Sequence, residues 1–217
     1  MKRTVLGVTL AALAVAGTSV AMVAVAQDMP ARGTMDVSKV SKGTYDADPG
    51  HTLVGWRVNP LGFNDYFGLF GDVDGTLTID PADPSAATVD VTIPITSLAV
   101  VSEGLRDHML RPGKDGGDPD FFGAEPEAAR FVSTSVDVGA DGTSASITGD
   151  LTMNGVTKPV TIDARFTGAG SNPMKKVETI GFEGTATIMR SDFGVDYALP
   201  LVSDEVELTI SAAFEKQ

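Results

Sequence analysis

Residues 205–214, EVELTISAAF, decide the fold of this chain. Apolar side chains alternate along them with glutamate, threonine and serine, from Val206 through Leu208 and Ile210 to Phe214. Successive side chains of a β-strand point to opposite faces of a sheet, so this stretch has one apolar and one wet face. Buried parallel strands are apolar on both faces, and the alternation therefore predicts an antiparallel sheet.

The same period of two recurs at residues 88–95 and 160–167. Asn154-Gly155 lies between two further candidate strands and is a strong signal for a two-residue hairpin. Segments with a less regular pattern are also expected to be strands, namely residues 53–58, 66–79, 129–138, 143–153 and 180–189.

About eight long strands with short connections favour an all-β fold, a closed eight-stranded antiparallel barrel. A sandwich of two sheets is the alternative. One short helix is expected at residues 102–110, with Leu105 and Met109 on one face. An eight-stranded barrel is either filled by its own side chains or holds one small ligand, and periodicity alone does not separate the two.

Residues 1–26 predict a secretory signal peptide, because a basic MKR start precedes a long apolar run and a small-residue AVA site that ends at Ala26. Cleavage is expected after Ala26. An uncleaved membrane anchor is the alternative, since the run is long enough to span a bilayer at about 20 residues. Both interpretations place the rest of the chain outside the cytoplasm, and the expected location is periplasmic or secreted.

Residues 27–43 are polar and lack periodicity, so they are expected to form a flexible lead-in to a single domain over residues 44–217. Removal of the signal peptide takes away Lys2 and Arg3 and no acidic residue, so the net charge of −13 becomes −15. This acidity argues against nucleic acid or anionic membranes as partners. No integral membrane span is expected after signal cleavage.

Catalytic and metal-binding motifs are not recognisable. The chain has no cysteine, and His51 and His108 lie far apart without a metal-ligand spacing. The acidic loop at residues 115–120 lacks the spacing of a calcium loop, and a solvated loop is the preferred interpretation. We therefore expect a binding protein without metal or cofactor rather than an enzyme.

Several motifs resemble the YceI-like family, exported lipocalin-like barrels that bind polyisoprenoid-type lipids. Residues 45–52 (YDADPGHT) look like the opening signature of that family, and residues 149–160 (GDLTMNGVTKPV) are the most specific match. Further matches follow in the same order along the chain, at residues 61–63 (LGF), 106–110 (RDHML), 120–122 (DFF), 130–134 (RFVST), 190–194 (RSDFG) and 203–206 (SDEV).

Two positions depart from the family pattern. Asn59-Pro60 stands where the family often has a histidine, and Met109 occupies another usual histidine position, with His108 beside it. If polar residues at the barrel mouth recognise a ligand headgroup, these changes would alter which headgroup is accepted.

The resemblance implies a lipocalin-like barrel that stores or carries a polyisoprenoid, an isoprenoid quinone or another long-chain amphiphile. A lipid-acting hydrolase or isomerase, and a filled stress-response interaction module, are the alternatives.

Trp56 lies in register with Val54 and Val58, and its indole N–H needs a partner when it is buried. His51 and Arg106 are candidate headgroup contacts. The expected apolar lining consists of Val54, Trp56, Val58, Phe63, Phe67, Phe70, Phe131 and Phe182.

Overall fold

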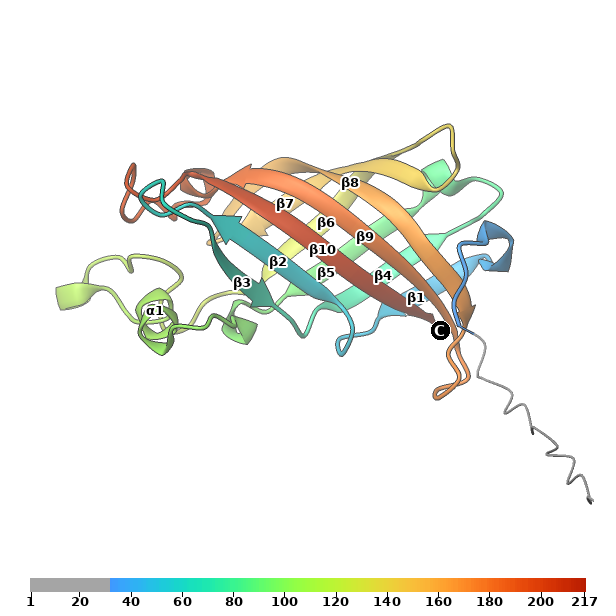
Figure 1. The fold of residues 1–217 in the computed structure, drawn as a ribbon, viewed down its shortest axis with the longest axis horizontal. Coiled ribbons are helices and arrows are strands. Elements are labelled where there is room, and N and C mark those ends of the chain that lie inside the picture. The colour runs from blue at the N-terminus through green and yellow to red at the C-terminus, as the bar shows by residue number, and fades with distance from the viewer. Residues whose placement is uncertain (1–31) are drawn as a thin grey trace, which may run out of the picture. The chain divides into compact units, whose positions relative to one another are not determined.

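The computed structural model describes residues 32–217, which form an antiparallel β-barrel with one α-helix (Figure 1). The predicted signal peptide, residues 1–26, lies outside the described residues. Over residues 32–217 none of the helices has the length and apolar character that a membrane crossing requires.

The strands are β1 (Gly43–Ala47), β2 (Leu53–Val58), β3 (Tyr66–Phe70), β4 (Asp74–Ile79), β5 (Thr88–Ile93), β6 (Ala129–Val138), β7 (Ser144–Met153), β8 (Val156–Ser171), β9 (Glu178–Met189) and β10 (Glu205–Lys216). The helical segments are η1 (Val37–Lys39), η2 (Pro84–Ala86), η3 (Ile95–Ser97), α1 (Glu103–Met109), η4 (Lys114–Gly116) and η5 (Arg190–Phe193).

The ring is closed by β10, which pairs with two strands along one edge. Near its C-terminal end Lys216 lies opposite Tyr45 of β1, and along its first half Leu208 lies opposite Trp56 of β2. Strand β4 pairs with β1, and β3 pairs with β2. Strands β1 and β2 therefore share one position in the ring, and strands β3 and β4 share the next. The ten strands fill eight positions around the ring. The closed eight-stranded antiparallel barrel is confirmed.

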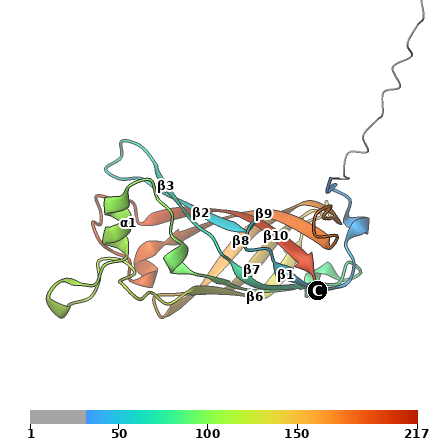
Figure 2. The same cartoon turned by 90° about the horizontal axis from the view of Figure 1, so that it is seen from below.

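One end of the barrel is covered by the connection between β5 and β6. The outer edge of β3 makes one isolated bridge, in which Leu69 and Ala99 exchange backbone hydrogen bonds of 3.0 and 2.9 Å. The chain leaves the ring after Ile93 and passes through η3, α1 and η4 before it re-enters at Ala129. Figure 2 shows α1 at this end of the barrel, beyond β2 and β3.

The short helix α1 begins and ends where the sequence predicts. Ser102 is its N-cap, and the Ser102 hydroxyl accepts a hydrogen bond from the Leu105 backbone N–H at 3.2 Å. This bond satisfies one of the backbone donors that a helix leaves free at its start. Met109 is buried and Leu105 is half-buried, so the predicted apolar face of the helix turns toward the barrel.

The hairpin between β7 and β8 forms at the predicted turn. Asn154 and Gly155 have φ angles of 50° and 72°. Two consecutive positive φ angles are the requirement of a type I′ turn, and asparagine and glycine adopt them at low cost.

The opposite end of the barrel is approached by the segment that precedes β1. Thr34 exchanges backbone hydrogen bonds of 3.0 and 2.9 Å with Ala169 of β8. The Ser41 backbone N–H and the Tyr45 hydroxyl both donate to Oε1 of Glu178, at 2.7 and 2.6 Å. The later part of the predicted flexible lead-in therefore has hydrogen-bonded positions on β8 and β9, which its aperiodic sequence did not reveal.

Candidate functional site

The barrel interior contains two adjoining cavities. We call the space enclosed by β2, β3, α1 and residues 190–204 the mouth cavity, and its volume is about 340 Å³. The space enclosed by β4 to β10 and η1 is the inner cavity, of about 600 Å³. Both volumes lie in the range of small-molecule sites, about 300–1,000 Å³. The walls of the two cavities have four residues in common, namely Val54, Ile93, Leu151 and Leu208.

The inner cavity is walled by aliphatic side chains and phenylalanines. Phe182 lies between Phe166 and Phe214, with ring centroids 5.8 and 6.3 Å apart. Glu183 is the one charged residue among the described residues of this wall, and its half-exposed side chain pairs with Arg165 at 2.6 Å. Such a mostly apolar lining removes a hydrocarbon from water, and its uncharged polar residues are Ser38, Thr52, Thr143 and Ser144.

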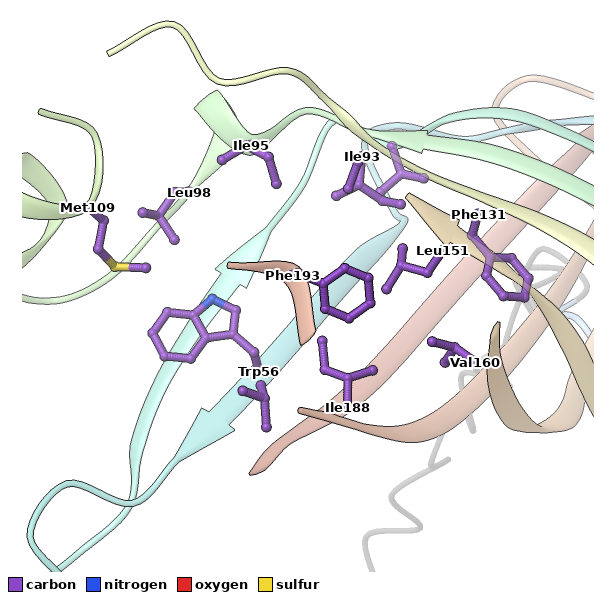
Figure 3. Packing of buried hydrophobic residues seen from close by; sticks show 13 residues of the cluster. Trp56, Ile93, Ile95, Leu98, Met109, Phe131, Leu151, Val160, Ile188 and Phe193 are labelled. Carbon is purple, nitrogen blue, oxygen red and sulfur yellow. The ribbon is translucent and has the colours of Figure 1, made fainter. Parts of the chain in front are cut away.

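The mouth cavity is also apolar but has more aromatic walls. Trp56 and Tyr66 lie with ring centroids 6.3 Å apart, and Phe70 meets Phe122 edge to face at 6.1 Å. Figure 3 shows the Trp56 indole on the side toward Met109 and Leu98, with Phe193 and Ile188 further along the same cluster. Aromatic pairs in these geometries are favourable beyond the area that they bury.

A second aromatic group at the mouth is organised around His108 of α1. The imidazole meets Phe121 and Tyr197 edge to face, at centroid distances of 5.2 and 4.8 Å. His108 Nε2 lies 2.6 Å from Asp120 Oδ2, which also accepts from Arg111 at 2.9 Å. The hydrogen bonds from His108 and then Arg111 lower the pKa of Asp120 below its usual value. The group ties α1 to the loop that follows it.

Arg190 borders the mouth cavity but is occupied by the protein itself. Its guanidinium donates to the carbonyls of Ser203 at 2.8 Å, Val195 at 2.7 Å, Tyr197 at 2.9 Å and Val202 at 3.1 Å. Burial lowers the pKa of this arginine below its usual range. The arginine therefore fixes residues 190–204, which form one wall of the mouth, and four of its five N–H donors are engaged by backbone carbonyls.

Six of the residues predicted to line the interior do line a cavity. Trp56, Val58 and Phe70 border the mouth cavity, and Val54 borders both. Phe131 and Phe182 border the inner cavity. Whether each contacts a ligand stays a prediction.

The other four predicted residues lie outside both cavities. Phe63 is 85% exposed in the turn after β2, and Phe67 is 62% exposed because the inward positions of β3 are those of Tyr66, Gly68 and Phe70. The inward placement of both phenylalanines is thus corrected.

The two predicted polar contacts are also outside the cavities and have protein partners. His51 lies in the turn between β1 and β2, where its largely exposed ring pairs with Asp48 at 2.7 Å. Arg106 Nε donates to the Leu98 carbonyl at 3.1 Å and thereby ties α1 to the segment before it. Neither side chain faces the spaces where a ligand would be enclosed.

The sequence reasoning did not assign Tyr66, Phe121 or Tyr197 to the mouth, and it connected His108 with the mouth only as the neighbour of the family departure at Met109. Tyr66 and Phe70 are four residues apart on one strand, so their side chains face the same side of the sheet. The alternation along residues 66–70 therefore already predicted that Tyr66 lies inward with Phe70. His108, Phe121 and Tyr197 come from a helix and two loops, and no period brings them together. At the two family departures, Met109 is buried in the mouth wall, and Asn59 donates to Asp65 at 3.0 Å within the β2–β3 turn.

The fold and the site together define a lipocalin-like antiparallel barrel with an apolar interior. The chain belongs to the YceI-like family, whose domain matches residues 45–214. Protein YceI of Escherichia coli O157:H7 is 38% identical over 212 residues, covering 97% of this chain and 96% of that protein. Among solved structures, BcnA of Burkholderia cenocepacia matches with a TM-score of 0.62 at 23% identity, over 77% of this chain and 99% of BcnA. A polyisoprenoid binding domain from Saccharophagus degradans matches with a TM-score of 0.57 at 11% identity, over 80% and 98%.

Proposed function

We propose that this chain binds, stores or carries a long apolar amphiphile, such as a polyisoprenoid, an isoprenoid quinone or a similar lipid. The observation that carries the proposal is the pair of adjoining apolar cavities, of about 340 and 600 Å³, inside the closed barrel. The similarity in fold to the polyisoprenoid binding domain of Saccharophagus degradans supports the same class of ligand.

The energetics of transfer favour a long ligand. Each buried CH₂ group contributes about 0.8 kcal/mol, and association costs about 4–15 kcal/mol. A chain must therefore bury on the order of ten carbons before binding becomes useful. A chain that occupied both cavities would bury more carbons than a chain confined to either one, and it would have to pass between the shared residues Val54, Ile93, Leu151 and Leu208.

Binding is favoured over lipid hydrolysis or isomerisation by the chemistry of the walls. The imidazole and the guanidinium that border the mouth, those of His108 and Arg190, are held by Asp120 and by four backbone carbonyls. A general acid or base needs a proton position that faces the reacting atom of the substrate. A filled barrel that acts only through its surface fits poorly with an interior that contains two cavities.

Native mass spectrometry of protein purified from its own host tests the proposal. We expect a bound mass that organic extraction removes and that has the composition of a prenyl or acyl lipid. A ligand-free protein that also takes up no long-chain amphiphile from solution would contradict it.

Export is a separate part of the proposal. The basic start, the apolar run and the AVA site at Ala26 support delivery to the periplasm or the medium. Sequencing of the exported protein should begin at or near Gln27. A membrane-bound protein that still begins at Met1 would instead indicate an uncleaved anchor.

A further inference from the structure

Exposed apolar side chains gather at the end of the barrel that carries the mouth cavity. Among residues 32–217 the exposed phenylalanines are Phe63 and Phe67, with 85% and 62% of their surface accessible. Leu61, Val101 and Leu201 are also largely exposed. Single exposed apolar residues are ordinary on protein surfaces, whereas a contiguous group of them marks a surface that meets another apolar surface.

Backbone contacts make this group contiguous. The Leu61 N–H donates to the Leu201 carbonyl at 2.7 Å, so the β2–β3 turn lies beside the loop that precedes β10. Leu69 of β3 exchanges hydrogen bonds with Ala99, and this brings the segment that continues to Val101 to the outer edge of β3. Figure 1 shows these segments at one end of the barrel. The exposed residues that we call the apolar rim are Leu61, Phe63, Phe67, Leu69, Val101 and Leu201.

The apolar rim is continuous with the wall of the mouth cavity. Pro60, Tyr66 and Val202 border this cavity, and a chain neighbour of each belongs to the rim. Tyr197 also borders the cavity, although its side chain is partly exposed at the surface. Apolar surface therefore extends from the cavity wall to the outside of the barrel, where it meets the solvent.

The charges at this end of the barrel do not favour an anionic partner. Arg57, which lies opposite Phe67 on β2, pairs with both Asp65 and Glu207. Glu103 at the start of α1 is exposed, and the whole chain has a net charge of −13. Adsorption to a lipid surface depends on the apolar area that is buried and on attraction between charges. Here only the apolar contribution is favourable, so a zwitterionic surface suits the rim better than an anionic one.

We propose that the apolar rim docks the barrel on a zwitterionic lipid bilayer with the mouth cavity toward the membrane, so that the amphiphile passes between bilayer and cavity without crossing water. The inference rests on the proposed function, because it assigns the surface from which the ligand is taken or to which it is delivered. A bilayer suits the rim better than a second copy of the chain, since a partner subunit on the rim would cover the mouth.

Flotation with vesicles tests the docking directly. Protein that begins at Gln27, the expected exported form, is mixed with phosphatidylcholine vesicles and separated on a density gradient. We expect the protein to float with the vesicles, and raised salt to leave this binding in place because no attraction between charges is screened. Replacing part of the phosphatidylcholine with anionic phosphatidylglycerol should weaken the binding.

Substitutions in the rim should weaken docking without changing the cavities. Phe63→Ser and Phe67→Ser each remove a large apolar side chain from the contact, so each should lower the vesicle partition coefficient about tenfold. Both residues lie outside the two cavities, so the affinity for a prenyl quinone in solution should be unchanged. The rate at which the quinone moves from vesicles to the protein should fall with the partition coefficient.

Met174→Ser is the matched control. Met174 is 90% exposed in the hairpin between β8 and β9, which Figure 1 shows at the other end of the barrel. The neighbouring Lys175 pairs with Glu215 near the C-terminal end of β10, at 2.9 Å. This variant loses an equally exposed apolar side chain away from the rim, and it should float as the wild type does.

The outcomes separate docking from ligand binding. A wild-type protein that binds prenyl lipids in solution and does not float with phosphatidylcholine vesicles overturns the inference alone. A protein that floats in a rim-dependent way but takes up no long-chain amphiphile contradicts the proposed function and leaves the docking surface established. Flotation that Phe63→Ser and Phe67→Ser retain, or that requires phosphatidylglycerol and disappears in salt, overturns the inference. A dimer that the same substitutions dissociate, without flotation of the wild type, identifies a second copy as the partner and also overturns it.

Discussion

The mouth cavity and the inner cavity differ in what they offer a ligand. The inner cavity is enclosed by strands whose inward residues alternate regularly, and a triad of phenylalanines with aliphatic neighbours forms its wall. The mouth cavity is enclosed partly by a helix and loops, and its wall includes the polar side chains of Tyr66, His108, Arg190 and Tyr197. Regular sheet thus encloses the inner cavity, whereas the wall of the mouth cavity combines strand residues with residues of a helix and loops.

The loop wall of the mouth depends on Arg190, and its removal should have the largest effect. Arg190→Met leaves one buried carbonyl, that of Val195, and three part-buried carbonyls without their donor, and an unsatisfied buried carbonyl costs about 1–3 kcal/mol. We expect a loss of about 3–5 kcal/mol in the free energy of unfolding, measured by urea denaturation.

Arg165→Met is the control for that change, because Arg165 forms an exposed pair with Glu183 on the outer surface. Exposed ion pairs contribute about 0–1 kcal/mol, so this variant should unfold almost as the wild type does. Equal losses for the two variants would show that Arg190 does not hold the mouth.

The inner cavity can be blocked without touching the mouth. Ala164→Trp places an indole in the inner cavity, where Ala164 forms part of the wall. Displacing about four methylene groups costs about 3 kcal/mol, so prenyl lipids should bind about 100-fold more weakly whatever their headgroup. Isothermal titration with a prenyl quinone and a prenyl hydrocarbon measures both losses.

Thr161→Trp on the same strand is the matched control, since Thr161 is exposed and its hydroxyl lies 3.0 Å from that of Thr148 on the outer face. This variant should bind as the wild type does. If Ala164→Trp also bound normally, the inner cavity would not be the site of the chain.

Acid should loosen the mouth before it affects the inner cavity. The pKa of Asp120 is lowered from its usual 3.8 by His108 and Arg111, so its ionised form is stabilised in the folded protein. The ionised carboxylate adds to the free energy of unfolding above pH 3.8. This added stability is lost as the pH falls through the lower pKa that Asp120 has in the folded protein. Asp120→Asn should therefore melt below the wild type at pH 7, and the two melting temperatures should converge as the pH falls below 3.8 through the lowered pKa of Asp120.

That prediction is checked by differential scanning calorimetry across the same pH range. A gap between wild type and Asp120→Asn that is constant with pH would mean that the charge of Asp120 contributes nothing to the fold.

Most of the barrel could be predicted from the sequence because strand alternation is local information. The stretch that includes Val206 and Phe214 became β10, and the Asn154-Gly155 signal became a hairpin. The brief strand β1 was not recognised, although buried Tyr45 and Ala47 have the spacing of inward residues and close the ring against β10. Five residues are too short for a period to be distinct.

The mouth was harder to predict because its residues come from segments without a period. His108, Phe121 and Tyr197 meet only after the β5–β6 connection and residues 190–204 have folded against each other. In the segment 66–79 the phenylalanines Phe67 and Phe70 have opposite parity, so a single strand cannot turn both inward. The structure ends β3 at Phe70, and this assigns Phe70 to the cavity and Phe67 to solvent.

The smallest effect is expected at Phe63, which the sequence placed in the lining and the structure places in solvent. Phe63→Ser should change the free energy of unfolding by less than about 0.5 kcal/mol, as is usual for exposed side chains. Prenyl-lipid affinity should also be unchanged, because the side chain borders neither cavity. Phe70→Ser is the comparison, since Phe70 borders the mouth and packs on Phe122, and it should lower both stability and affinity. A Phe63→Ser protein that loses its lipid as Phe70→Ser does would show that the binding surface extends beyond the mouth cavity onto the β2–β3 turn.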